Sequence, residues 1–134
     1  MNELEKEIWD FLHDHLQSIF TKDVATYTAT TSEDLSLYEW FVSPHRMDGL
    51  PFHLFMIEHS WAGNGDYRYD LLEPRLQLFG LDQPTITAVV SYTFMLTMQT
   101  ETGLSHNSHN ESRVLVKENG RWQIVHVHKS PAGQ

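Results

Sequence analysis

Four side chains of this sequence have the chemistry to hold an anion or to move a proton. Arg113 lies in an alternating run, so on a strand it shares a face with Leu115, and a guanidinium among apolar neighbours needs an acidic partner or a bound anion. A salt bridge to Glu39 or Glu58 is the structural alternative to an anion site. His53 could act as a general base near physiological pH with Glu39 or Glu58 as its acid–base partner. No motif selects among these catalytic candidates, so none is assigned.

The remaining histidines are weaker candidates for a functional site. His126 and His128 are two apart on an expected strand, so both project from one face, a spacing that permits shared metal ligation. The sequence singles out no third ligand, and the same parity of Trp122 and Ile124 favours packing or a subunit interface. We therefore predict no metal site and no cofactor. Four further histidines are expected at the surface: His13, His15, His106 and His109.

Amphipathic helices must position these groups. Apolar side chains recur at helical spacing over residues 4–20, opposite an acidic face. The members of this stripe are Leu4, Ile8, Phe11, Leu12, His15, Leu16, Ile19 and Phe20. Asp23 is suited to cap a short second helix that contains Tyr27. A further helix begins near Pro51, runs to His59, and is stopped by Gly63-Asn64-Gly65.

The rest of the chain has the alternation typical of strands. One strand is expected over residues 34–42, before Pro44, and four more follow the helices, over residues 67–80, 85–100, 105–118 and 121–129. Asn119-Gly120 between the last two is the clearest hairpin turn. Helices first and long antiparallel strands afterwards predict an α+β domain, in which helices close off a curved sheet and leave a pocket.

Composition and charge restrict the function. A chain of 134 residues predicts one domain over residues 1–134. The net charge of −9 repels phosphates and anionic lipids, so we expect neither nucleic acid nor membrane as a partner. The absence of cysteine excludes disulfides and thiolate chemistry. Acidic residues stand at the N-terminus where a secretory signal would be basic, so we predict a cytoplasmic protein.

Several separated segments together resemble one known domain. They are Gly49–Phe55 with Glu58 and Trp61, Glu111–Val114, and the run from Asn119 to Ser130. In this order they are similar to the association (hub) domain of calcium/calmodulin-dependent protein kinase II, over nearly the whole chain. That domain belongs to the nuclear transport factor 2-like (SnoaL-like, cystatin-like) superfamily. The resemblance implies a cone-shaped fold whose curved antiparallel sheet wraps around N-terminal helices and encloses a cavity.

The resemblance also implies a ligand site in that cavity. The family can hold small carboxylates there, and His53, Trp61 and Arg113 match its histidine, its tryptophan and one of its arginines. Phe94 and Lys129 stand where two further arginines are expected. A lysine supplies only a point charge and a phenyl ring none, so anion binding should be weaker or directed at a different ligand. The expected lining is Arg113, His53, Trp61, Lys129, Phe94 and Tyr38.

Two functions follow from the resemblance. The first is a stand-alone oligomerisation module, a homodimer or a larger ring, with a cavity for a small carboxylate or an apolar ligand. The alternative is a small cavity enzyme like the SnoaL-like cyclases, dehydratases and isomerases, with an acid–base pair of a histidine and a carboxylate. No kinase motif is present, so no kinase activity is expected. No basic amphipathic helix is visible either, so calmodulin is not an expected partner.

Overall fold

The computed structural model describes residues 2–59 and 66–133, and within them three helices and six strands. In chain order they are α1 (Glu3–Phe20), α2 (Val24–Thr30), β1 (Thr31–Glu39), β2 (Met47–Asp48), α3 (Leu50–Glu58), β3 (Tyr67–Phe79), β4 (Ile86–Thr100), β5 (Gly103–Glu118) and β6 (Arg121–Pro131). The three expected helices and the four long C-terminal strands are confirmed. No helix in the described part of the chain is long and apolar enough to cross a membrane.

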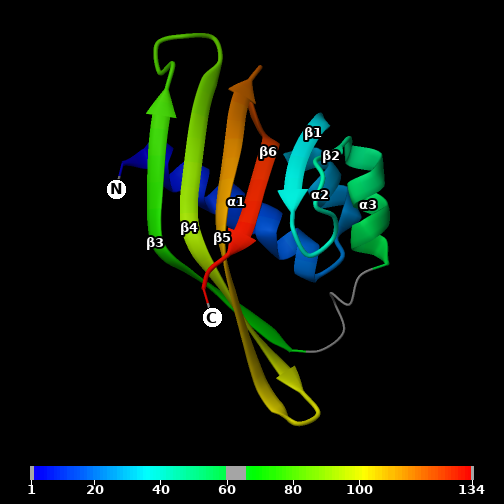
Figure 1. Cartoon of the computed structure of the whole chain (residues 1–134). Helices are drawn as coiled ribbons and strands as arrows, with labels where there is room; N and C mark the ends of the chain where they lie inside the picture. The colour runs from blue at the N-terminus through cyan, green and yellow to red at the C-terminus, as the bar shows by residue number, and fades with distance from the viewer. Residues whose placement is uncertain (1, 60–65, 134) are drawn as a thin grey trace.

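The six strands form one curved sheet in the order β2-β1-β6-β5-β4-β3. Every neighbouring pair is antiparallel except β1 and β6, which run parallel, so the expectation of an antiparallel sheet is wrong at that one pairing. Figure 1 shows α1 passing behind β3 to β6, with α2 and α3 beside β1. The opposite face of β4, β5 and β6 is not covered by any described helix.

Helix α1 carries the apolar stripe that builds the core. Ile8, Leu12 and Leu16 are almost completely buried and pack with residues of the sheet in one hydrophobic cluster. Full burial of such a side chain contributes about 1.5–3 kcal/mol. The Asn2 side chain caps the helix N-terminus by accepting a hydrogen bond from the backbone N–H of Glu5, at 2.8 Å. The stripe thereby fixes which face of α1 meets the sheet.

Strand β1 ends earlier than its alternation predicts. The backbone N–H groups of Val42 and Ser43 donate to the carbonyl oxygen of Glu39, at 2.9 and 3.1 Å, and turn the chain away from the sheet. Trp40 and Phe41 therefore lie outside the strand, and they are 42% and 60% exposed. Glu39 is therefore the last residue of β1, at the edge of the core.

A bulge in β6 changes which face its side chains occupy. Relative to β5, β6 carries one extra residue between Ile124 and His126. Ile124 and Val127 are both buried, whereas His126 and His128 project from the opposite face of the sheet. The two histidines share a face, as predicted, but the expectation that Trp122 and Ile124 share it with them is wrong, because the bulge shifts the alternation by one.

Two glycines have the same left-handed backbone conformation but different space around their Cα atoms. Gly80 has a φ of +74° and Gly120 a φ of +75°. A Cβ on Gly80 would lie 2.8 Å from the Thr85 carbonyl oxygen, whereas one on Gly120 meets nothing within 4 Å. Gly120→Ala should cost about 1–2 kcal/mol for the left-handed conformation alone. Gly80→Ala should cost roughly 1–3 kcal/mol more, because backbone atoms must move. Urea unfolding of both variants tests this, and equal losses would contradict the structure.

Candidate functional site

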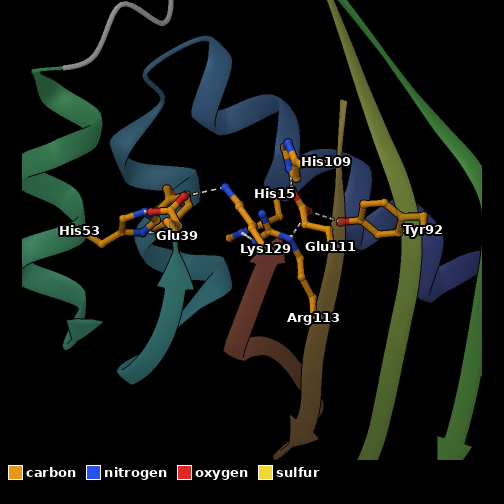
Figure 2. Close-up of polar contacts among 9 residues, drawn as sticks. His15, Glu39, His53, Tyr92, His109, Glu111, Arg113 and Lys129 are labelled. Atoms are coloured by element: carbon orange, nitrogen blue, oxygen red, sulfur yellow. Dashed lines mark hydrogen bonds and ion pairs between the residues drawn. The ribbon is translucent and has the colours of Figure 1, made fainter. Parts of the chain in front are cut away.

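Nine polar residues form a network of hydrogen bonds and ion pairs between the helices and the inner face of the sheet. We call them the buried polar network: His15, Tyr27, Glu39, His53, Tyr92, His109, Glu111, Arg113 and Lys129. They come from α1, α2, α3 and four strands, and Figure 2 shows them converging between the helices and the sheet. The network has two halves, one around each of its carboxylates.

Glu111 is the centre of the first half. Arg113 Nε donates to its Oε1 at 2.8 Å, and the Tyr92 hydroxyl donates to the same oxygen at 2.5 Å. His109 Nε2 lies 2.6 Å from the other oxygen. Burial opposes ionisation of Glu111, but the Arg113 charge and the His109 hydrogen bond outweigh it and hold the pKa of Glu111 well below its usual value. Glu111 is therefore a buried carboxylate anion with its partners in place.

His15 binds the other side of the guanidinium. Arg113 Nη1 lies 3.1 Å from His15 Nε2, and His15 Nδ1 lies 2.7 Å from the Thr30 hydroxyl. A guanidinium only donates, so His15 Nε2 accepts and the imidazole is neutral. Burial, and next the Arg113 charge, lower the pKa of His15 well below its usual value. The prediction that His15 lies at the surface is wrong, and its place between Leu12 and Leu16 in the apolar stripe was the signal that it is buried.

Glu39 is the centre of the second half. Lys129 Nζ donates to its Oε2 at 2.6 Å, and His53 Nε2 lies 3.4 Å from its Oε1. The Tyr27 hydroxyl lies 2.5 Å from His53 Nδ1. A neutral His53 with its proton on Nε2 fits both neighbours, since it accepts from Tyr27 and points its N–H at Glu39. Burial alone would raise the pKa of Glu39, but Lys129 and His53 outweigh it and bring the pKa to about 2.

The network is balanced in charge. Arg113 and Lys129 are its cations, Glu111 and Glu39 are its anions, and each cation has its own carboxylate partner. Arg113 is only 1% exposed. The sequence allowed a salt bridge from Arg113, and the partner is Glu111 instead of Glu39 or Glu58. Nothing in this arrangement requires an external anion, because each buried charge is compensated within the fold.

The other predicted site residues lie apart from the network or beside it. Glu58 ends α3 and is exposed. Tyr38 is 36% exposed and lies on the outer face of the sheet, so its prediction as cavity lining is wrong. Phe94 is buried and stacks on the His109 ring at 5.2 Å, so it fills space next to the network. Trp61 lies outside the described residues. His109, which we expected at the surface, is instead a network member with a side chain 17% exposed.

Two hollows of the described surface lie elsewhere. One, of about 610 Å³, separates α1 from the β5–β6 hairpin, and the other, of about 370 Å³, lies between α1 and β3. Neither is lined by a member of the buried polar network. The expectation of a ligand cavity around Arg113 and His53 therefore gains no support from them. Within residues 2–59 and 66–133 no group of three or more His, Asp or Glu residues could hold a metal ion.

Comparison with known proteins identifies relatives over nearly the whole chain. The family model of the calcium/calmodulin dependent protein kinase II association domain matches residues 4–133. A calcium/calmodulin-dependent protein kinase type II from Caenorhabditis elegans is 30% identical over 116 residues, which are 86% of this chain and 15% of that protein. This chain thus corresponds to only a small part of the curated relatives that it matches.

Solved structures agree with this fold. The association domain of the C. elegans kinase superposes with a TM-score of 0.79 at 26% identity, and the match covers 95% of both chains. A nuclear transport factor 2-like superfamily protein from Salmonella enterica, at 21% identity, gives a TM-score of 0.74 and covers 96% of this chain and 91% of its own. The predicted α+β class and nuclear transport factor 2-like fold are therefore confirmed.

A double-mutant comparison tests the charge balance of the network. Arg113→Met leaves Glu111 buried without its cation, so we expect the free energy of unfolding to fall by about 3–5 kcal/mol. Arg113→Met combined with Glu111→Gln removes both charges and should lose less than the single variant. The matched control is Lys117→Met, which breaks a more exposed pair with Glu7, at 2.9 Å, and should cost about 1 kcal/mol or less. A double variant at least as unstable as Arg113→Met would show that charge balance does not hold this site.

Proposed function

This chain belongs to the family of calcium/calmodulin-dependent protein kinase II association domains, and from that premise we propose that it is a self-associating module. Its subunits meet through the face of the sheet that α1 does not cover. The described helices leave this face uncovered, as Figure 1 shows, so it is accessible to another subunit. The observation that carries the proposal is the composition of this face.

We call the surface formed by three cross-strand rows the open face. The rows are Ser36, His126, Val114 and Val89; Tyr38, His128, Ser112 and Ser91; and Ser130, Asn110 and Thr93. None of these residues is Asp, Glu, Lys or Arg, although such residues make up 20% of the chain. Depletion of charge is the compositional mark of an interface core. At the β3 edge the second row ends in Arg75, opposite Ser91. Three partly exposed rows without charge across β1, β6, β5 and β4, on a chain of net charge −9, support burial against another copy.

The buried polar network does not offer a comparable binding site. Both ring nitrogens of His53 face protein groups, Tyr27 and Glu39, so no nitrogen is left to act on a substrate. A small carboxylate would have to displace Glu111 from Arg113, or Glu39 from Lys129, and leave a buried carboxylate unpaired. These contacts favour a structural role for the network over the acid–base enzyme and over the carboxylate site.

A second apolar surface supports an assembly larger than a dimer. Phe52 and Phe55 of α3 are 51% and 57% exposed, and Trp40 and Phe41 are exposed at the end of β1. Both segments lie at the β1 side of the sheet (Figure 1). The open face can pair with itself about a two-fold axis, whereas a closed ring of such pairs needs a second interface. We propose that the α3 surface supplies it.

The open face is tested by placing one charge in its middle. We expect wild-type protein at micromolar concentration to have at least twice the 15.6 kDa mass of one chain. Val114→Glu should reduce the mass, because the interface would bury an unpaired carboxylate. Gln17→Glu, on the exposed side of α1, adds the same charge and should leave the mass unchanged. Light scattering measures the masses, and circular dichroism checks the folds. A wild-type mass of one chain would overturn the proposal.

The α3 surface makes a separate prediction. If it joins pairs into a larger assembly, Phe55→Asp should lower the mass to two subunits and no further, since the open face is intact. Val114→Glu should instead leave the species that the α3 surface alone holds together, since it disrupts only the open face. Analytical ultracentrifugation separates these species. A Phe55→Asp protein with the wild-type mass would exclude α3 from the assembly.

A further inference from the structure

We propose that self-association of this chain is controlled by pH through His126 and His128, an inference that rests on the proposed function. Subunits associate through the open face while both imidazoles are neutral and separate when these rings bind protons. Three observations carry this inference: the position of the two rings, the absence of compensating charge around them, and the symmetry of a contact made by identical faces.

The two imidazoles lie side by side at the centre of the open face. His126 Nδ1 lies 2.8 Å from the Ser36 hydroxyl. The Tyr38 ring meets both histidines, with ring centroids 6.3 Å from His126 and 5.0 Å from His128. Strand pairing places Val114 opposite His126 and Ser112 opposite His128. Both histidines therefore have neutral neighbours on either side.

Among the described residues around the two rings, no carboxylate is free to pair with a protonated imidazole. On β1 the neighbours are Ser36 and Tyr38, and on β5 they are Ser112 and Val114. Beyond β1, Asp48 of β2 pairs with Ser36, but its carboxylate already receives the Arg46 guanidinium at 2.8 Å.

The next strand, β4, contributes Val89 and Ser91 to the rows of these two histidines. Beyond β4, strand β3 ends these two rows with Gln77 and with Arg75, which lies opposite Ser91. Arg75 is a cation, so it cannot compensate a protonated imidazole. Another titratable ring, His106, lies on the same face near the β4–β5 turn, 2.9 Å from the Thr97 hydroxyl. A proton taken up by His126 or His128 would thus stay uncompensated within the described part of the face, and burying it would cost free energy.

Symmetry multiplies this cost. An isologous contact brings the same patch from two subunits together, so the interface holds two copies of each histidine. Histidine is the side chain whose charge ordinarily changes between about pH 5 and 8. Free subunits bind protons that the assembly excludes, so a fall in pH favours dissociation. Each proton released on association changes the dissociation constant about tenfold per pH unit.

Sedimentation of the full chain at about pH 7.5 and about pH 5.5 tests the switch. We expect the dissociation constant to rise about a hundredfold or more between the two, with near-ultraviolet circular dichroism showing that the subunit stays folded. In the double variant His126→Asn, His128→Asn the ratio of the two constants should fall close to one. The matched control, His13→Asn with His45→Asn, replaces two exposed histidines outside the open face and the α3 surface and should keep the wild-type ratio.

A measurement on unaltered protein keeps the inference testable if the double variant does not associate. Calorimetric dilution in buffers of different ionisation enthalpy counts the protons taken up on dissociation, and we expect a net uptake of protons. Association at both pH values with no proton uptake would overturn the switch and leave the proposed function intact. A single-chain mass at about pH 7.5 would overturn both.

Discussion

The pairing of Arg113 with Glu111 is the interaction on which the rest of the structure depends. A guanidinium and a carboxylate that are both almost fully buried are stable only if each polar atom has a partner. Tyr92 from β4 and His109 from β5 supply partners to the carboxylate, and His15 supplies one to the guanidinium. Helix α1 must therefore lie across β5 at one position along its axis, which the apolar stripe alone would not specify.

The strands that hold this pair also form a surface of opposite character. On β5, Glu111 and Arg113 point inward while Ser112 and Val114 point outward, because successive side chains of a strand alternate between faces. All charge carried by the middle of β5 is thus paired inside the fold, and its outer face is left uncharged. The bulge in β6 extends the same division, since it turns Lys129 toward Glu39 and both His126 and His128 outward. One arrangement of strands produces the buried network and the open face together.

Sharing a fold with nuclear transport factor 2-like proteins does not by itself decide a function, because this architecture supports unrelated activities. In this chain the titratable groups of the inner face are paired with one another. Lys129 and Glu39 are paired with each other, and His53 is held between Glu39 and Tyr27, so the inner face presents protein groups to protein groups. Membership of the association-domain family supports the proposed self-association.

Much of this fold follows from the sequence alone. Apolar residues that recur about every 3.6 residues located the helices, and those that recur at every second residue located the long strands. A positive φ at both Asn119 and Gly120 agrees with the predicted hairpin turn. The need of Arg113 for an acidic partner also followed from its apolar neighbours, but the sequence analysis named Glu39 and Glu58, and the partner is Glu111 on the same strand. The bulge between Ile124 and His126 had no such signal, since one unpaired residue reverses the alternation without changing the composition. The local sequence pattern therefore determined the helices and strands and the need for charge compensation. The partner of each charge and the face of each histidine depended on strand register and helix docking. These are decided by the tertiary structure alone, because they are set by contacts between residues far apart in the chain.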